Sequence, residues 1–286
     1  MENSAVLLPQ RAAQNHARRS RNGKIKVGAV NRSAVVLKIL VGVLLFLTVY
    51  AFWSFDYKEI QLGEAIAATL HNMKTVFLEP KLSTDTIQNV LYQLLVTFCL
   101  GILSTIFGAV LAFFCALLCA RNLAPARLAD VIKSIVALVR AVPTVLWVLI
   151  FAVSAGLGSV AAVIGLTFHS FAYLTKVYAE SMEEVDSGTL EALRASGAGF
   201  WQIVFQAIVP SAISRMVAWT FMRFEINFTN AVAMGAAAGA GGIGFQLFMA
   251  GSFYFNLHEM GFLTYVVVIA VVILEFCSTK IKATVK

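Results

Sequence analysis

Residues 87–120 decide the fold, and they read IQNVLYQLLVTFCLGILSTIFGAVLAFFCALLCA. This run contains no Asp, Glu, Lys or Arg. A helix needs about 20 consecutive apolar residues to cross the hydrocarbon core of a bilayer. The run exceeds that length, as a helix tilted in the membrane does. It therefore predicts a transmembrane helix.

The rest of the chain has the same character. Of its 286 residues, 59% are hydrophobic and only 13% are charged, and the mean hydropathy is +0.82. A water-soluble domain carries roughly 25% charged residues, because polar side chains must cover its surface. These values predict an all-α protein that crosses the membrane several times. They exclude a soluble enzyme, a disordered chain and a secreted disulfide scaffold.

A second apolar run, from Ala34 to Trp53, predicts the first transmembrane helix. Residues 1–33 before it carry seven basic residues and one acid. A basic arm can bind nucleic acid, but beside an apolar run it more simply keeps this end of the chain in the cytoplasm. A cleaved signal peptide is the competing interpretation, but its apolar region would span only about 7 to 15 residues. We therefore expect the helix to be retained.

Residues 54–86 are more polar, and we expect them to form a segment outside the membrane. Ile66, Leu70, Met73 and Phe77 recur there at helical spacing. This pattern predicts a short amphipathic helix, either at the membrane interface or within an ordinary loop.

Three further apolar regions follow residues 87–120. The region 141–175 is interrupted by Gly156–Ser159, which predicts two helices joined by an external turn. The regions 213–235 and 261–276 predict one helix each. The total is about six spans, so both termini lie on one side. The basic N-terminal arm and the C-terminal lysines place both termini in the cytoplasm.

The polar loop 181–210 then also lies in the cytoplasm. It contains Glu191-Ala-Leu-Arg-Ala-Ser-Gly197, and Pro210 follows thirteen residues after the glycine. A glycine suits a tight turn, and a proline suits the start of the next helix. The pattern resembles the Glu-Ala-Ala loop of ABC importer permeases. The family's Glu, Ala, Gly and Pro keep their spacing here, while Leu193, Ala207 and Val209 replace other family residues.

This resemblance implies a coupling role for five residues of the loop: Glu191, Ala192, Arg194, Gly197 and Pro210. They would belong to a rigid module that sits in a groove of a partner ATPase and passes its movement to the attached spans. A simple connection between two helices is the alternative for so short a motif.

Four further motifs narrow the resemblance to phosphonate-type permeases. They are Arg140-Ala-Val-Pro-Thr-Val-Leu-Trp147, Gly156-Leu-Gly158, Arg223-Phe-Glu-Ile-Asn227 and Gly239-Ala-Gly-Gly-Ile-Gly244. The resemblance runs from about Gly63 to the C-terminus. It implies a type I ABC importer permease fold, with residues 87–286 as the permease core, in the bacterial cytoplasmic (inner) membrane. It also implies import of phosphonates or related phosphorus oxyanions such as phosphite and phosphate.

The resemblance implies partners as well. These are a second copy of the chain in a homodimeric pore, two ATP-binding cassette subunits and an extracytoplasmic phosphonate-binding protein. ATP and Mg would be bound by the partner ATPase, because this sequence contains no Gly-x4-Gly-Lys-Ser/Thr loop. We therefore expect a non-catalytic membrane subunit that needs no cofactor, metal or nucleic acid of its own.

Two charges fall inside the span predicted for residues 213–235. At 1.5 Å per residue, Arg223 and Glu225 lie about 15 to 18 Å along the helix, near the middle of a bilayer core of about 30 Å. Arg223 and Asn227 share one helix face, and Glu225 lies on nearly the opposite face. We expect Arg223 and Asn227 to face the pathway or gate, and Glu225 to pair with a base such as Arg140. An intramembrane ion pair without ligand contact is an equal alternative.

Other interpretations remain beside the importer. Thr229 stands where the resembling family usually has Arg, which leaves the charge pairing and the substrate open. An ion-gradient-driven secondary transporter would use Glu225 as its ion carrier, although the loop motif argues against it. An intramembrane enzyme would need a nucleophile with its base, and no such set stands out. The GxGxxG pattern of residues 239–244 follows no strand, so it predicts close packing or a re-entrant turn rather than a dinucleotide site.

Overall fold

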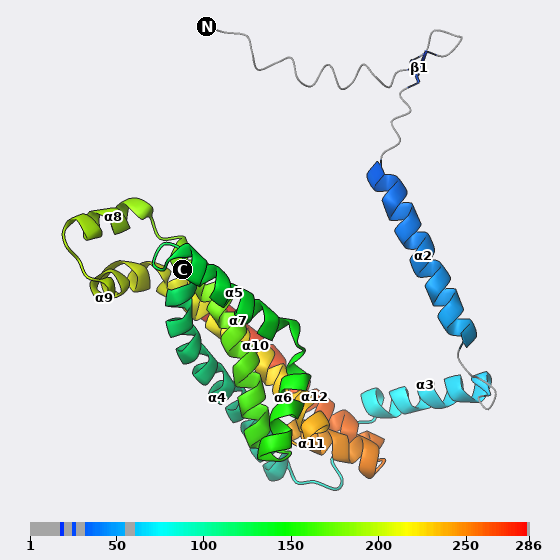
Figure 1. The fold of residues 1–286 in the computed structure, drawn as a ribbon. Helices are drawn as coiled ribbons and strands as arrows, with labels where there is room; N and C mark the ends of the chain where they lie inside the picture. Colours follow the sequence, from blue (N-terminus) through cyan, green and yellow to red (C-terminus); the bar gives the residue numbers. More distant parts are fainter. Residues whose placement is uncertain (1–17, 20–24, 27–31, 55–60, 285–286) are drawn as a thin grey trace. The chain divides into compact units, whose positions relative to one another are not determined.

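The computed structural model describes residues 18–19, 25–26, 32–54 and 61–284. The chain consists of two compact units, residues 1–65 and 66–286. The first unit contains the long helix α2 (Arg32–Ser54), which coincides with the first predicted span (Figure 1). It also contains the short antiparallel strands β1 (Arg18–Arg19) and β2 (Ile25–Lys26). The remainder of the predicted basic arm lies outside the described residues.

The second unit is a bundle of helices (Figure 1). Helix α3 begins at the end of the first unit and continues into the second. Its elements in chain order are α3 (Leu62–Leu78), α4 (Ile87–Cys119), α5 (Ala126–Ala141), α6 (Thr144–Ala155), α7 (Ser159–Glu183), α8 (Ser187–Ala195), α9 (Phe200–Ile203), the π-helical turn η2 (Val204–Ile208), α10 (Val209–Ala238), α11 (Gly242–Phe248), the π-helical turn η3 (Met249–Phe253) and α12 (Leu257–Thr284). Helix α3 is the amphipathic helix expected in the segment 54–86.

Five helical runs in the described part of the chain are long and apolar enough to cross a membrane. They are α2, α4, α7, the run from α9 to α10, and α12. Helices α5 and α6 would make a sixth span if taken together, but they are bent by 87°. The fold is therefore all-helical apart from the two short strands, with five or six candidate spans.

The predicted third span, which was to begin near residue 141, is the 12-residue helix α6, and a break at its start separates it from α5. Helix α5 ends at Ala141 and α6 begins at Thr144, on either side of Pro143. Proline lacks the N–H needed to continue a helix, and its ring clashes with the preceding turn. The turn at the far end of α6 is as predicted, because Gly156 and Gly158 both adopt positive φ angles, 79° and 141°. Those angles favour glycine.

The predicted polar loop 181–210 is shorter than expected. Helix α7 continues to Glu183, and a helical run that reaches Ala238 begins at Phe200. The charges at the end of α7 led the sequence analysis to end the span too early. In the structure those side chains lie at the end of the bundle, where charged groups remain hydrated.

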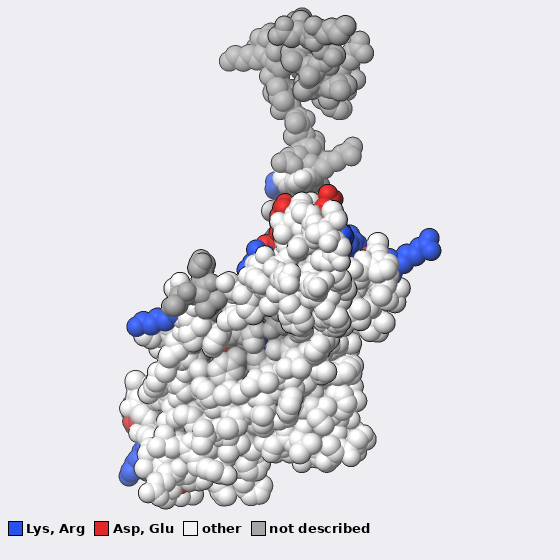
Figure 2. All heavy atoms as spheres, turned by 90° about the vertical axis from the view of Figure 1, so that its left-hand side faces the viewer, with Lys and Arg blue, Asp and Glu red and all other residues white. Residues whose placement is uncertain are grey.

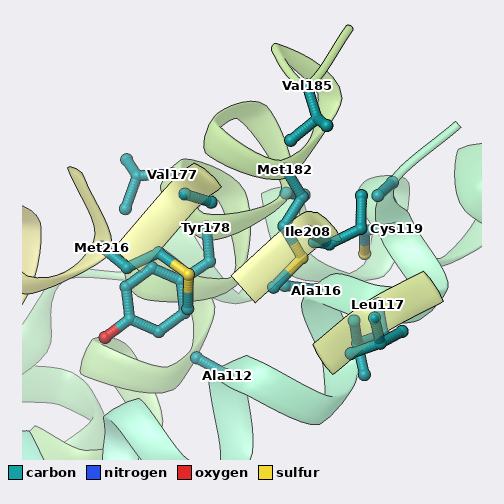
Figure 3. Packing of buried hydrophobic residues seen from close by; sticks show 14 of the residues in the cluster. Ala112, Ala116, Leu117, Cys119, Val177, Tyr178, Met182, Val185, Ile208 and Met216 are labelled. Carbon is teal, nitrogen blue, oxygen red and sulfur yellow. The ribbon is translucent and has the colours of Figure 1, made fainter. Parts of the chain in front are cut away.

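Helix α8 is fixed to the bundle by a cluster of buried apolar residues. Figure 3 shows the cluster, in which Ala112 and Ala116 of α4 pack with Met182 of α7 and Ile208 of η2. Leu190 of α8 belongs to the same cluster and is only 2% exposed. Burying a leucine contributes about 1.5–3 kcal/mol. The short helix is therefore held against α4, α7 and α10.

Small residues allow the long helices to approach closely. A Cβ atom added to Gly165 of α7 would lie 2.6 Å from the backbone of Val148 in α6. A Cβ atom on Gly108 of α4 would lie 2.7 Å from the Cβ of Ser170 in α7. Close contact through small residues is a common way to associate helices in membranes, where the hydrophobic effect gives no drive.

We predict that Gly165→Ala lowers the free energy of unfolding by about 1–3 kcal/mol, because the added methyl forces α6 and α7 apart. The measurement is thermal unfolding of the detergent-solubilised chain. The matched control is Gly42→Ala, in the middle of α2, where nothing lies within 4 Å of an added Cβ. Equal melting of the two variants would contradict the packing assigned to Gly165.

Candidate functional site

Helix α8 is built as a compact, defined module. Asp186 caps its first turn, because its Oδ2 accepts a hydrogen bond from the backbone N–H of Thr189 at 2.9 Å. At the other end Gly197 adopts a φ of 84°. The N–H of Ala198 donates to the carbonyl of Leu193 at 3.0 Å, which closes the last turn. Glycine at the predicted position is thus required by the turn.

The predicted coupling residues of α8 divide into exposed and anchoring groups. Glu191 and Ala192 are exposed. Arg194 is also exposed, but its Nη2 donates to the backbone carbonyl of Asn122 at 2.6 Å. The Nδ2 of Asn122 in turn donates to the carbonyl of Met182 at 2.8 Å. Arg194 therefore ties α8 to the α4–α5 connection and to the end of α7.

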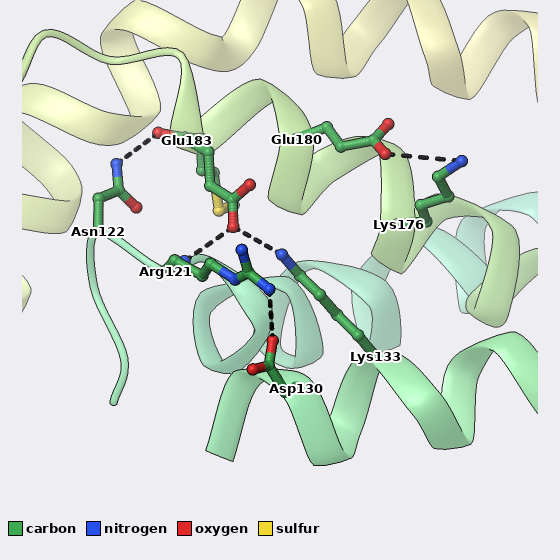
Figure 4. A network of polar contacts seen from close by, with 8 residues as sticks. Arg121, Asn122, Asp130, Lys133, Lys176, Glu180 and Glu183 are labelled. Atoms are coloured by element: carbon green, nitrogen blue, oxygen red, sulfur yellow. Dashed lines mark hydrogen bonds and ion pairs between the residues drawn. The ribbon is translucent and has the colours of Figure 1, made fainter. Parts of the chain in front are cut away.

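Charged groups tie the neighbouring helix ends together (Figure 4). The Oε1 of Glu183 accepts hydrogen bonds from the backbone N–H of Arg121 at 2.8 Å and from Lys133 Nζ at 2.7 Å. Arg121 also bonds Asp130 at 2.7 Å, and this contact raises the pKa of the Arg121 guanidinium, first through the hydrogen bond and then through the opposite charge. The end of the bundle beside α8 is thus cross-linked between α4, α5 and α7.

We predict that Arg194→Ala loosens α8 without unfolding the bundle. Loss of a hydrogen bond to a charged group costs about 1 kcal/mol at an exposed site, which corresponds to about fivefold faster local opening. Hydrogen exchange of residues 187–195 measures this. Arg127→Ala, which removes an exposed arginine of α5, is the control and should leave that exchange unchanged. Unchanged exchange in Arg194→Ala would show that the bond does not hold α8.

Pro210 lies in the first turn of α10, and a shorter helical stretch leads into that helix without a break. The run from α9 passes through the π-helical turn η2 before α10 begins at Val209. A proline cannot donate the usual backbone hydrogen bond, and a widened turn accommodates the missing donor. Pro210 thus stands at the start of α10, as predicted, although the helical run as a whole already begins at Phe200.

Three aromatic side chains beside α8 were missed by the sequence analysis. Phe200, Trp201 and Phe205 are 43%, 53% and 59% exposed, and their rings form a contiguous row with centroids 5.3 and 5.9 Å apart. The signal was a group of aromatic residues directly after a polar loop. Figure 2 shows the face that bears α8 and α9, with charged side chains gathered around its end and a broad uncharged surface elsewhere.

The predicted pathway residues form a buried polar cluster inside the bundle. Arg223 and Asn227 of α10 are 2% and 0% exposed. Asn227 Nδ2 donates to Thr105 of α4 and to Ser170 of α7, both at 2.8 Å. Arg223 Nε donates to Ser170 at 3.0 Å. These bonds link α4, α7 and α10.

The guanidinium of Arg223 has further neighbours, and none of those in the described part of the chain is an acid. Its Nη2 lies 2.9 Å from Nδ1 of His169, and its Cζ lies 5.3 Å from the centre of the Tyr173 ring. His169 of α7 thus belongs to the same polar cluster. Whether Arg223 and Asn227 also face a pathway in an assembled transporter stays a prediction.

Glu225 lies on the other side of α10, as the helical spacing predicts. It is partly buried and shares a pocket with Thr229 and with Leu274 of α12. Arg140 lines a different pocket, between α5 and α7, so these positions give the predicted pairing of Glu225 with Arg140 no support. The hydroxyl of Thr229 donates to the backbone carbonyl of Glu225 at 3.2 Å.

The glycine-rich segment 239–244 serves close packing. A Cβ atom on Gly244 would lie 1.8 Å from the carbonyl oxygen of Val232. The N–H of Gly242 donates to Gln93 of α4 at 3.1 Å, and that of Ile243 donates to Thr97 at 2.9 Å. The segment thus seats α11 between α4 and α10, as expected for small residues rather than for a dinucleotide loop.

Comparisons with known proteins agree with this architecture. Residues 108–283 match the family described as "Binding-protein-dependent transport system inner membrane component". The chain is 33% identical over 153 residues to the "Phosphate-import permease protein PhnE" of Mycolicibacterium smegmatis, covering 53% of this chain and 29% of that protein. It is 34% identical over 152 residues to the "Phosphite transport system permease protein PtxC" of Stutzerimonas stutzeri, covering 53% and 55%. The chain therefore spans about half or less of the length of these relatives.

A solved structure shares the fold. The inward-facing MetNI methionine ABC transporter matches with a TM-score of 0.64 at 24% identity, covering 72% of this chain and 100% of that one. The bundle thus has the type I ABC importer permease fold, and its apolar helices are those of a multi-pass inner membrane protein. Because residues 108–283 make up more than half of its length, the chain belongs to the family of binding-protein-dependent transport system inner membrane components.

Proposed function

We propose that this chain is the translocating subunit of an ATP-driven importer for phosphonates or related phosphorus oxyanions such as phosphite and phosphate. Two copies form the pathway, a separate ATPase supplies the energy from inside, and an extracytoplasmic binding protein delivers the substrate. The chain itself hydrolyses nothing.

The observation that carries this proposal is the construction of α8. The helix exposes Glu191 and Ala192, while Leu190 is buried in the cluster formed by α4, α7 and α10. A short helix anchored in this way can receive a push on its exposed face and transmit it to the spanning helices as a rigid element. The exposed row of Phe200, Trp201 and Phe205 supplies apolar contact area beside it, of the kind enriched in the cores of protein interfaces.

The proposed substrate class rests on the relatives and on the charges. Relatives named as phosphate, phosphite and phosphonate permeases share 28–34% of aligned residues with this chain. The buried cluster contributes a cation, Arg223, with no acid among its contacts in the described residues. A site that offers an uncompensated cation favours anions.

The test is ATP hydrolysis by the chain co-purified with its ATPase and binding protein and reconstituted in vesicles. Methylphosphonate, 2-aminoethylphosphonate, phosphite and phosphate are supplied in turn. Stimulation by one of them would identify the substrate. If no ATPase co-purified and uptake followed a proton gradient, the importer proposal would fail, and Glu225 would become the candidate ion carrier of a secondary transporter.

A further inference from the structure

A cavity of about 260 Å³ lies between α5 and α7, beside the end of α4. Its size is below the roughly 300–1,000 Å³ typical of pockets for drug-sized ligands, so it suits a small ligand. Three bases line it, Lys133, Arg140 and Lys176, together with Thr175. The wall is therefore rich in hydrogen-bond donors.

Two acids in the cavity wall offset two of the three bases. Glu183 bonds Lys133 at 2.7 Å, and Glu180 lies 3.6 Å from Lys176. Within the described residues, no carboxylate lies within ion-pair distance of Arg140. One positive charge therefore remains in the wall, that of Arg140. A net positive cavity attracts an anion.

Thr175 gives an independent indication of a ligand. Its side chain is 0% exposed, and its Oγ1 has no hydrogen-bond partner among the described residues. A buried hydroxyl left without a partner costs about 1–3 kcal/mol. An oxyanion in the cavity would accept this hydrogen bond and remove the cost.

We propose that this cavity binds one phosphate-type oxyanion, with Arg140 supplying the uncompensated charge and Thr175 the buried hydroxyl donor. The bound group is either a free phosphorus oxyanion or the phosphate of an anionic lipid headgroup, since both present the same oxygens. If the proposed function holds, a free oxyanion here is the imported substrate held at the end of the bundle beside α8. Binding itself does not depend on that function.

The experiment uses the purified full-length chain in phosphatidylcholine nanodiscs and measures binding of radiolabelled inorganic phosphate. Arg140→Gln should weaken binding at least about tenfold, because it removes the charge-assisted bonds. Thr175→Val, which keeps the shape and removes the hydroxyl, should weaken it about fivefold. Arg127→Gln removes a base of the same helix outside the cavity and should change nothing. A second arm adds phosphatidylglycerol to the nanodiscs.

The outcomes show whether the cavity binds a free oxyanion or a lipid headgroup. Phosphate binding that phosphatidylglycerol leaves unchanged identifies a free oxyanion, and competitive loss of binding identifies a lipid headgroup. Either outcome supports the site, provided that Arg140→Gln and Thr175→Val weaken the binding while the melting temperatures of the two variants match that of the parent. The proposal is overturned if phosphate does not bind saturably in phosphatidylcholine, or if both variants bind it like the parent. Binding without any oxyanion-stimulated ATP hydrolysis would keep this site and remove the proposed function.

Discussion

Replacing Glu191 with lysine is expected to reduce oxyanion-stimulated ATP hydrolysis by the assembled importer about 100-fold, because opposing like charges at an interface costs several kcal/mol. Glu191 is exposed on α8. Its carboxylate makes no hydrogen bond or ion pair with the described part of the chain. The substitution should therefore leave the fold intact and act on the partner contact alone. The measurement is the substrate-stimulated ATPase rate in vesicles.

The control for Glu191→Lys is Glu64→Lys, which makes the same charge change at an exposed acid of α3. It should leave stimulation at the parent level. Co-purification with the ATPase distinguishes failure to assemble from failure to couple. Full stimulation in Glu191→Lys would mean that α8 is not the element that receives the movement of the ATPase.

The spans were predictable because lipid imposes a simple rule on sequence. A helix in hydrocarbon must be long and apolar, so α2, α4 and α12 could be read from long apolar runs. The break between α5 and α6 was harder to predict. Residues 126–141 carry several charges and form no apolar run, although Val131, Ile135 and Leu138 recur there at helical spacing. A single sequence gives no measure of which faces are covered by neighbouring helices.

The candidate site was only partly predictable for a similar reason. The capped, glycine-terminated α8 follows from local chemistry, since Asp186 and Gly197 act on their own turns. The opposite faces of Arg223 and Glu225 follow from helical geometry. The partners of Arg223 lie more than 50 positions away in sequence, and contacts at such separations depend on how α7 and α10 pack. Periodicity within one helix carries no information about that packing.

Arg223→Met is expected to leave the stability of the chain unchanged or raised, while lowering oxyanion-stimulated ATP hydrolysis at least about tenfold. A buried charge costs several kcal/mol in desolvation. The contacts of Arg223 in the described residues are neutral groups, Ser170 and His169, and the ring of Tyr173. Each hydrogen bond returns about 1.5–3 kcal/mol, and the ring contact about 2 kcal/mol or less. The gain and the cost are of similar size, so stability alone does not require this arginine.

A methionine fills similar volume without a charge, and replacing buried ionic groups by apolar ones is often neutral or stabilising. The two interpretations of Arg223 therefore differ in what they predict. If the arginine only holds α7 against α10, thermal stability and ATP hydrolysis should fall together in Arg223→Met. If its charge serves the passage of an anion, activity should fall while the melting temperature does not, and Arg223→Lys, which keeps the charge, should recover part of the activity. Parent-level hydrolysis by a stable Arg223→Met variant would rule out the pathway role and leave Arg223 as a residue of the helix contacts.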